Sequence, residues 1–379
     1  MPELIEYLDK MYYCMRCGFC RATCPTLAQK NMAESFSPRG RILLMRGLLT
    51  GELKASPELA EKIFLCATCR QCHTKCPPGL EIDKIVEAAR HELIKAGVAP
   101  PAPHKQIALS ILENDNPLGE PRDTRAKWLD TEAVLPNKAE VLYWAGCMAS
   151  YREQEIAKNT VDILRKSKVK FTMLGSEESC CGSVLLRTGQ REFVEDKYAQ
   201  MNVDKILGKG AKTLVTACAG CYRTFREDYK DLLGDLPFEI LHISEYFERL
   251  IKDGKLVFRK ELPLKVTYHD PCHLGRHAGV YDAPRNVIKA IPGVELLEMG
   301  RTREESRCCG AGGGVRSAYR DVSIKMAADR LKLDALPTGA EALVTPCPFC
   351  IINFKSAKET YGLKIEIIDL VGLISKALG

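Results

Sequence analysis

The sequence predicts a multidomain α+β protein, in which a helical N-terminal domain is followed by two tandem α/β modules. Two observations support this fold class. Apolar residues recur every three or four positions through residues 1–98, whereas short strand-like apolar runs alternate with helical stretches from about residue 140 onward. The cysteine pattern of the first α/β half also returns in the second half. We therefore expect domains at 1–98, 139–258 and 259–379, with a linker at 99–138.

The N-terminal region carries four amphipathic runs that predict helices. They are LIEYLDKMYYCM, RILLMRGLLTGEL, SPELAEKIFLC and EIDKIVEAARHELIKAG. Ser56 followed by Pro57 is typical of a helix start, because serine caps the first turn and proline fits its first position. Proline-rich stretches at 99–104 and 116–123 then indicate a connecting segment.

Each α/β half contains four apolar runs of strand length. In the first half they are VLYW, KFTML, KTLVT and FEILHI; in the second they are KVTY, VELLEM, EALVT and KIEIIDL. Helical stretches separate the runs, and this alternation favours a mainly parallel sheet in each module.

Composition excludes several functional classes. With 379 residues, 46% hydrophobic and 27% charged, the chain is globular rather than disordered. A net charge of +6 with interspersed signs argues against a nucleic acid partner. No apolar run approaches the length of a membrane span, and the N-terminus lacks a secretory signal, so we expect a cytoplasmic protein. Eighteen cysteines in a reducing compartment then indicate metal or redox chemistry.

Two motifs of the form C-x-x-C-x-x-C-x-x-x-C-P lie near the N-terminus. In two-cluster ferredoxins the fourth cysteine of such a run binds the partner cluster. The motifs therefore predict one cubane [4Fe-4S] cluster on Cys14, Cys17, Cys20 and Cys76, and a second on Cys66, Cys69, Cys72 and Cys24. Zinc explains neither the third cysteine of each run nor its Cys-Pro ending. The 41-residue spacer between the motifs resembles the helical ferredoxin domain of respiratory iron–sulfur subunits.

Five further cysteines recur in each half, at offsets of 125 to 129 residues. They are Cys147, Cys180, Cys181, Cys218 and Cys221 in the first half, and Cys272, Cys308, Cys309, Cys347 and Cys350 in the second. Several follow strand-like runs directly, and ligand sites form at the carboxyl ends of parallel strands. Disulfides between adjacent cysteines are disfavoured. Neighbouring Cα atoms lie about 3.8 Å apart, whereas the two Cα atoms of a disulfide are usually separated by about 4.4 Å or more. An unusual metal cluster in each half fits better.

The spacing C-x₃₂-CCG-x₃₅-C-x-x-C, with its near copy in the second half, resembles the cysteine-rich CCG domain of heterodisulfide reductases. Related subunits serve glycolate, lactate and glycerol-3-phosphate oxidation. The stretches SPRGRI, HDPCHLGR and CCGAGGG strengthen the resemblance, and the domain order is similar to the fused D-type subunit. The resemblance implies one non-cubane [4Fe-4S] cluster on each set of five cysteines.

The same resemblance implies an iron–sulfur oxidoreductase subunit that passes single electrons between the cubanes and the non-cubane clusters, which reduce a disulfide. The alternative is an electron-transfer subunit of a flavin-dependent glycolate, lactate or glycerol-3-phosphate dehydrogenase complex. Expected partners are a flavoprotein dehydrogenase or electron-transfer subunit, or a membrane cytochrome b subunit through which the chain reaches a membrane.

Two features near the second set of cysteines have open interpretations. The glycine-rich run at residues 310–315 does not fit a dinucleotide motif, so its glycines are expected to let backbone N–H groups approach cluster sulfurs or substrate. His269, Asp270, His273 and His277 either deliver protons or orient the cysteine loop. No catalytic residue is assigned from the sequence.

Overall fold

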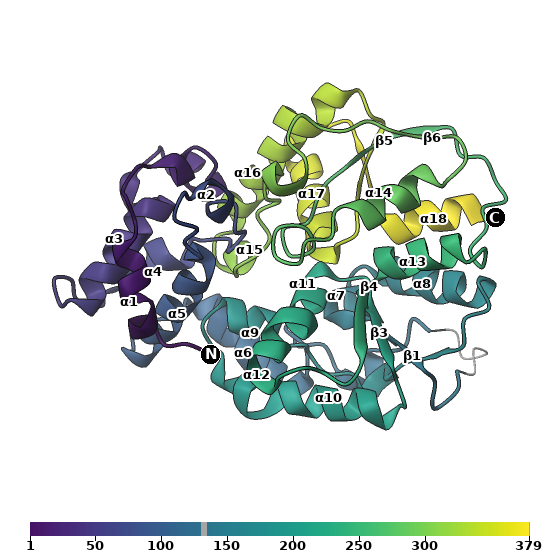
Figure 1. Cartoon of the computed structure of the whole chain (residues 1–379), viewed down its shortest axis with the longest axis horizontal. Helices are drawn as coiled ribbons and strands as arrows, with labels where there is room; N and C mark the ends of the chain where they lie inside the picture. The colour runs from purple at the N-terminus through teal and green to yellow at the C-terminus, as the bar shows by residue number, and fades with distance from the viewer. Residues whose placement is uncertain (130–134, 379) are drawn as a thin grey trace.

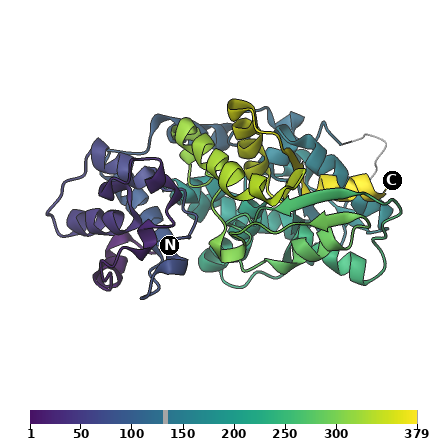
Figure 2. The same cartoon turned by 90° about the horizontal axis from the view of Figure 1, so that it is seen from above.

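The computed structural model describes residues 1–129 and 135–378, and it contains a helical domain beside two α/β modules. The helical domain lies at one side, and the two modules lie against each other on the other side (Figure 1; Figure 2 shows the same arrangement from above). All eight strand-like runs of the sequence are strands, which confirms the fold class. Among the described residues, no helix is both long and apolar enough to cross a membrane.

The N-terminal domain consists of short helices around an apolar core. Its main helices are α1 (Leu8–Tyr12), α2 (Pro25–Ala28), α3 (Pro38–Leu49), α4 (Pro57–Phe64) and α5 (Ile82–Lys95). The hydroxyl of Ser56 accepts a hydrogen bond from the Leu59 amide at 3.2 Å, as expected of a cap at the start of α4. Ile63 and Val86 are fully buried where α4 packs on α5.

The segment expected to be a linker contains a helix with a structural role. Helix α6 (Ala102–Asn114) packs on the second module, and Ile111 joins the core of the first module. Residues 99–129 are therefore more than a connection, because they contact both modules. Residues 130–134 of the expected linker lie outside the described residues.

The first module is a four-stranded parallel sheet with helices on both faces, in the strand order β2-β1-β3-β4. Its strands are β1 (Val141–Trp144), β2 (Phe171–Thr172), β3 (Thr213–Thr216) and β4 (Glu239–His242). Its helices are α7 (Gly146–Tyr151), α8 (Gln154–Lys166), α9 (Ser183–Arg187), α10 (Ala199–Gly208), α11 (Ala219–Arg223), α12 (Tyr229–Leu233) and α13 (Ile243–Lys252).

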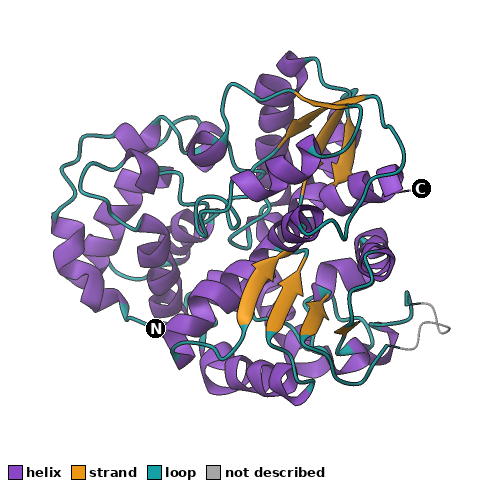
Figure 3. Cartoon of the chain, turned by 45° about the vertical axis from the view of Figure 1, so that its right-hand side comes forward, coloured by secondary structure: helices purple, strands orange, loops and turns teal. Residues whose placement is uncertain are grey.

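The second module repeats this plan in the order β6-β5-β7-β8, again all parallel. Its strands are β5 (Leu264–Tyr268), β6 (Val294–Leu296), β7 (Ala342–Thr345) and β8 (Glu366–Asp369). Its helices are α14 (Asp282–Lys289), α15 (Val315–Ala318), α16 (Arg320–Arg330), α17 (Pro348–Tyr361) and α18 (Leu370–Leu378). Figure 3 shows the two sheets with helices around each.

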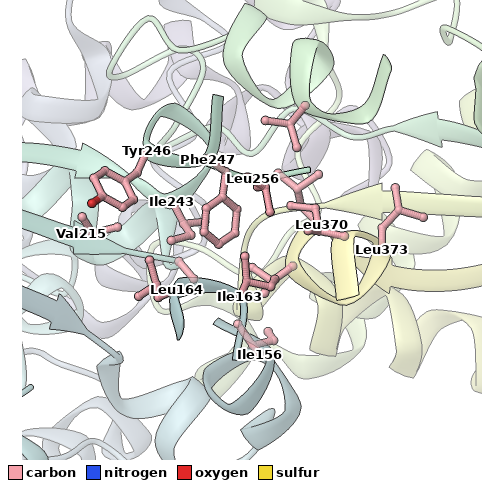
Figure 4. Packing of buried hydrophobic residues seen from close by; sticks show 14 of the residues in the cluster. Ile156, Ile163, Leu164, Val215, Ile243, Tyr246, Phe247, Leu256, Leu370 and Leu373 are labelled. Carbon is pink, nitrogen blue, oxygen red and sulfur yellow. The ribbon is translucent and has the colours of Figure 1, made fainter. Parts of the chain in front are cut away.

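The two modules share one hydrophobic core. Helix α13 of the first module packs against α14 of the second, and α18 of the second packs against α8 of the first. Figure 4 shows Ile163 of α8 and Phe247 of α13 close to Leu370 and Leu373 of α18. Because each module buries its last helix against the other, the pair forms one packed body in which the modules occupy equivalent positions.

Candidate metal centres

The eight cysteines of the N-terminal domain surround two small cavities. Cys14, Cys17, Cys20 and Cys76 line one cavity, and Cys24, Cys66, Cys69 and Cys72 line the other. Each cavity thus takes three cysteines from one motif and the last cysteine from the other. Gly18, at φ +83°, lies in the turn that wraps the first motif around its cavity.

The two cavities differ in their exposure to solvent. Cys17 is exposed, whereas the other seventeen cysteines, all described, are buried or half-buried. Burial raises the pKa of the Cys20 thiol to about 11 and also raises the pKa of Cys66. Since the thiolate is the form that binds metal, a bound cation is what holds such buried sulfurs ionised.

The first module gathers five buried cysteines at the carboxyl ends of its strands. Cys147 lies in α7 just after β1, the Cys180-Cys181 pair lies just before α9, and Cys218 and Cys221 flank the start of α11 after β3. Side-chain hydrogen bonds connect them in a chain: Cys147 to Cys180, Cys180 to Cys181, Cys181 to Cys221 and Cys221 to Cys218. Arg125 also donates from Nη2 to the Cys147 sulfur at 3.4 Å.

The second module gathers its five cysteines in the same way. The contacts run from Cys272 to Cys308, Cys308 to Cys309, Cys309 to Cys350 and Cys350 to Cys347. The sulfurs of Cys350 and Cys309 are 3.2 Å apart. Four of the five are buried and Cys272 is half-buried.

The donor set at all four places suits iron–sulfur chemistry. Four or five thiols converge in each, and thiolates are the ligands that iron–sulfur clusters take. Contacts with neighbouring thiols raise the pKa of Cys147, Cys221, Cys308 and Cys350 well above the usual value. Sulfurs that repel one another's charge in this way are stable as thiolates only around a shared metal group.

Comparisons with known proteins agree with this geometry. A 4Fe-4S dicluster domain matches residues 10–80, and a cysteine-rich domain, CCG, matches residues 141–226 and again residues 266–355. The D-type subunit of dihydromethanophenazine:CoB–CoM heterodisulfide reductase from Methanosarcina mazei is 39% identical over 97% of this chain and 93% of its own length. The chain belongs to the family of D-type heterodisulfide reductase subunits.

More distant relatives carry the same modules within other oxidoreductases. The EtfAB:quinone oxidoreductase of Syntrophomonas wolfei is 33% identical over 96% of this chain and 58% of that protein. The B-type subunit of fumarate reductase (CoM/CoB) from Methanothermobacter marburgensis is 29% identical over 99% of this chain and 74% of its own length. The chain is therefore an iron–sulfur oxidoreductase subunit, and the matched domains support bound iron–sulfur clusters.

The N-terminal domain contacts the second CCG module directly at a cysteine. The Cys308 thiol donates to the sulfur of Cys69, which lowers the pKa of Cys69 to about 6. Arg276 donates from Nε to the Cys69 carbonyl oxygen at 2.7 Å, and His277 Nε2 lies 3.0 Å from the Thr68 carbonyl oxygen. One cubane-type cavity and the second five-cysteine site thus share a sulfur–sulfur contact.

The glycine run after Cys309 packs against the N-terminal domain. A Cβ on Gly313 would overlap the carbonyl oxygen of Cys66 and lie 2.8 Å from the carbonyl carbon of Ala67. Its φ of +60° also favours glycine. The run therefore lets the two backbones meet, and the Gly310 amide also donates to the Cys308 sulfur at 3.3 Å, which agrees with the expected approach of a backbone N–H to sulfur. The first module has Leu185 and Leu186 in the matching stretch, and its close approach to the N-terminal domain comes slightly later, where a Cβ on Gly189 would lie 2.7 Å from the carbonyl carbon of Arg90.

Arg90, fully buried at the centre of this contact, connects all three parts of the chain. Its guanidinium donates to the carbonyl oxygens of Phe64 and Cys66 in the N-terminal domain, at 2.9 and 2.6 Å. It also donates to Arg187 in the first module and, at 2.9 Å, to Gly313 in the second. No pattern in the sequence indicates this role, because the carbonyls come from segments far apart in the chain.

A cavity of about 390 Å³ lies between the two modules. Cys272, Cys309, Cys347 and Cys350 of the second site line it, with His273, residues 312–314, Arg316 and Phe349. From the first module come Met148, Ser183, Val184, Arg187, Ala219 and Gly220. None of the five first-site cysteines is in its lining, so across residues 1–129 and 135–378 the cavity exposes sulfur only from the second site.

The polar residues around Cys272 have separate roles. The Asp270 carboxylate accepts from Arg285 at 2.6 Å and from the Arg303 amide at 2.8 Å, which fixes the cysteine loop. His277 docks the N-terminal domain through its contact with the Thr68 carbonyl. His273 lines the cavity, and Arg223 donates to its Nε2 at 3.3 Å, so its proton is on Nδ1.

Proposed function

We propose that the chain is the disulfide-reducing iron–sulfur subunit of a redox complex. The observation that carries the proposal is the continuous path of sulfur atoms. It runs from the exposed Cys17 region through the two N-terminal cavities, across the Cys69–Cys308 contact, to the cavity between the modules. Such a path suits single electrons that enter at one end and reach a substrate at the other.

The proposal assigns all eighteen cysteines as ligands. Two cubane [4Fe-4S] clusters take Cys14, Cys17, Cys20 and Cys76, and Cys24, Cys66, Cys69 and Cys72. Two non-cubane [4Fe-4S] clusters take Cys147, Cys180, Cys181, Cys218 and Cys221, and Cys272, Cys308, Cys309, Cys347 and Cys350. The domains that hold them are 1–98, 139–258 and 259–379, with 99–138 between the first two. When bound, the clusters supply electrons one at a time.

Reduction of a disulfide takes two electrons and two protons and yields two thiols. The cavity between the modules provides a place where a disulfide meets the sulfurs of the second site. His273 offers an Nδ1–H at the cavity wall, since Arg223 occupies its Nε2. Burial holds the pKa of His273 well below its usual value, so the neutral ring acts there as a hydrogen-bond donor. This donor is placed to stabilise a thiolate as it forms.

The remaining cavity wall favours an amphiphilic substrate. Ile107, Leu118, Val184 and Phe349 make part of it apolar. Arg316, half-buried, donates to Ser356 at 3.1 Å and forms no ion pair with a described carboxylate. An uncompensated guanidinium beside an apolar wall suits a disulfide with an aliphatic arm and an anionic group.

The proposal is tested on anaerobically purified protein. About sixteen irons per chain, with matching sulfide, are expected for four clusters of four irons. With reduced methyl viologen as donor, the CoB–CoM heterodisulfide should be converted to thiols faster than the neutral hydroxyethyl disulfide. Full iron content with no disulfide reduction, but electron acceptance from a co-purifying flavoprotein that oxidises lactate or glycolate, would replace this function by the dehydrogenase alternative.

We propose the exposed end of the path as the place where a flavoprotein or membrane cytochrome b subunit delivers electrons. Tyr13, Met15 and Phe19 surround Cys17 in sequence and are 66%, 71% and 62% exposed. Tyr13→Glu is expected to weaken reduction by the protein partner about 30-fold, because buried aromatic anchors contribute about 2 kcal/mol to interfaces. The check is the concentration dependence of the reduction rate. Reduction by dithionite, and the control Tyr361→Glu on α17, should be unchanged.

A further inference from the structure

The two CCG modules place different ring nitrogens at equivalent positions beside their cysteines. Trp144 and His269 each lie three residues before the first cysteine of their module, at the ends of β1 and β5. Trp144 packs edge-on against Phe225 with ring centroids 4.8 Å apart, and His269 packs edge-on against Phe354 at the same separation. The modules therefore hold the two rings in matching surroundings and differ in the N–H that each ring carries.

The hydrogen bonds of His269 fix which nitrogen carries its proton. Arg330 donates from Nε to His269 Nδ1 at 3.4 Å, and a guanidinium can only donate. The proton is therefore on Nε2. That atom is buried and makes no hydrogen bond of normal geometry to any described residue. An N–H left without an acceptor in the interior is costly, so a sulfur acceptor nearby is significant.

Sulfur is the acceptor available to this imidazole. A ring nitrogen of His269 and the sulfurs of Cys309 and Cys350 lie within 4.8 Å of one another. Hydrogen bonding from Cys308, from Cys350 and from His269 lowers the pKa of Cys309 well below its usual value. The indole Nε1 of Trp144 is likewise buried, without a partner in the described part of the chain, in the core that contains the first five cysteines.

We propose that His269 is a positioning residue that donates its Nε2–H to sulfur at the second five-cysteine site and thereby raises the reduction potential of the cluster there. The inference rests on the proposed function, because it requires a cluster at that site. Hydrogen bonds to cluster and ligand sulfurs stabilise the reduced, more negative state. His269 lies at the second five-cysteine site, which contacts Cys69 and whose cysteines line the cavity between the modules. A higher potential there favours the arrival of electrons where substrate is expected.

The test is a redox titration of the purified full chain, followed by electron paramagnetic resonance. His269→Phe, which keeps the ring packing and removes the N–H, is expected to shift one non-cubane signal to lower potential. His269→Gln keeps an N–H donor, so its reduction potential should return most of the way to the wild-type value. Trp144→Phe is the matched control in the first module, and it should leave the signal affected by His269→Phe at its original potential.

Iron and sulfide content are measured on every variant, which separates loss of a cluster from a change in its potential. Wild-type iron content with an unchanged potential in His269→Phe would overturn the inference while leaving the proposed function intact. Equal shifts in His269→Phe and His269→Gln would also overturn it, because they would assign the effect to packing. Absence of iron from the wild-type chain would instead refute the proposed function itself.

Discussion

Replacing Gly313 with alanine is expected to slow electron transfer from the N-terminal domain to the second CCG module several-fold. The added Cβ would overlap the Cys66 carbonyl oxygen, and backbone cannot yield as a flexible side chain can. The loop that carries Cys66 and Cys69 must then move away from Cys308. Electron transfer between two centres slows as the distance between them grows, so this displacement slows the step. Freeze-quench spectroscopy of the chain after mixing with dithionite measures this step.

Gly339→Ala is the matched control for that experiment. Gly339 also has a positive φ, +72°, but no described atom lies within 4 Å of the position of its Cβ. Both variants therefore carry similar backbone strain, and only Gly313→Ala carries the collision. Equal transfer rates in the two variants, with iron content preserved, would show that close approach of the glycine run does not set the rate.

Replacing Glu178 with alanine is expected to lower the free energy of unfolding by about 3–5 kcal/mol, as for other buried ion pairs that lose one partner. The buried Glu178 carboxylate accepts from Arg125 at 2.7 Å and from the amides of Ala145 and Gly146 at 2.9 Å. Its loss leaves the Arg125 guanidinium buried without its counter-ion and frees the loop before Cys147. Urea unfolding of the anaerobic protein, followed by circular dichroism, measures the change.

A surface ion pair provides the comparison for Glu178. Glu140 pairs with Lys212 while both side chains are more than 70% exposed. Glu140→Ala should therefore change the free energy of unfolding far less than Glu178→Ala, because solvent screens the exposed pair. If Glu178→Ala were as mild as Glu140→Ala, the buried carboxylate would not be what holds the Cys147 loop.

The strands and the repeat were predictable because their signals are local. Runs such as VLYW and KVTY are apolar, rich in strand-forming residues and bounded by polar turns, so each specifies a buried strand without reference to distant residues. The tandem CCG spacing likewise lies within single stretches of chain. Ser56 and Pro57 fixed the start of α4 for the same reason.

Local sequence patterns could not predict the contacts between domains. Arg90 gives no hint in the sequence that it will bind carbonyls of Cys66, Arg187 and Gly313, since these meet only after all three domains have folded. The glycine run illustrates the same limit. Its composition indicated a close backbone approach, but the partner backbone, that of Cys66 and Ala67, lies about 250 residues earlier in the chain.

The reciprocal burial of α13 and α18 makes the duplicated half of the chain mechanically rigid. Neither module can tilt without breaking the packing of α18 against α8 or of α13 against α14. The walls of the central cavity are consequently held at a constant separation, unlike those of enzymes that close on their substrates about a hinge. Selectivity at such walls depends on the length and shape of the molecule that enters.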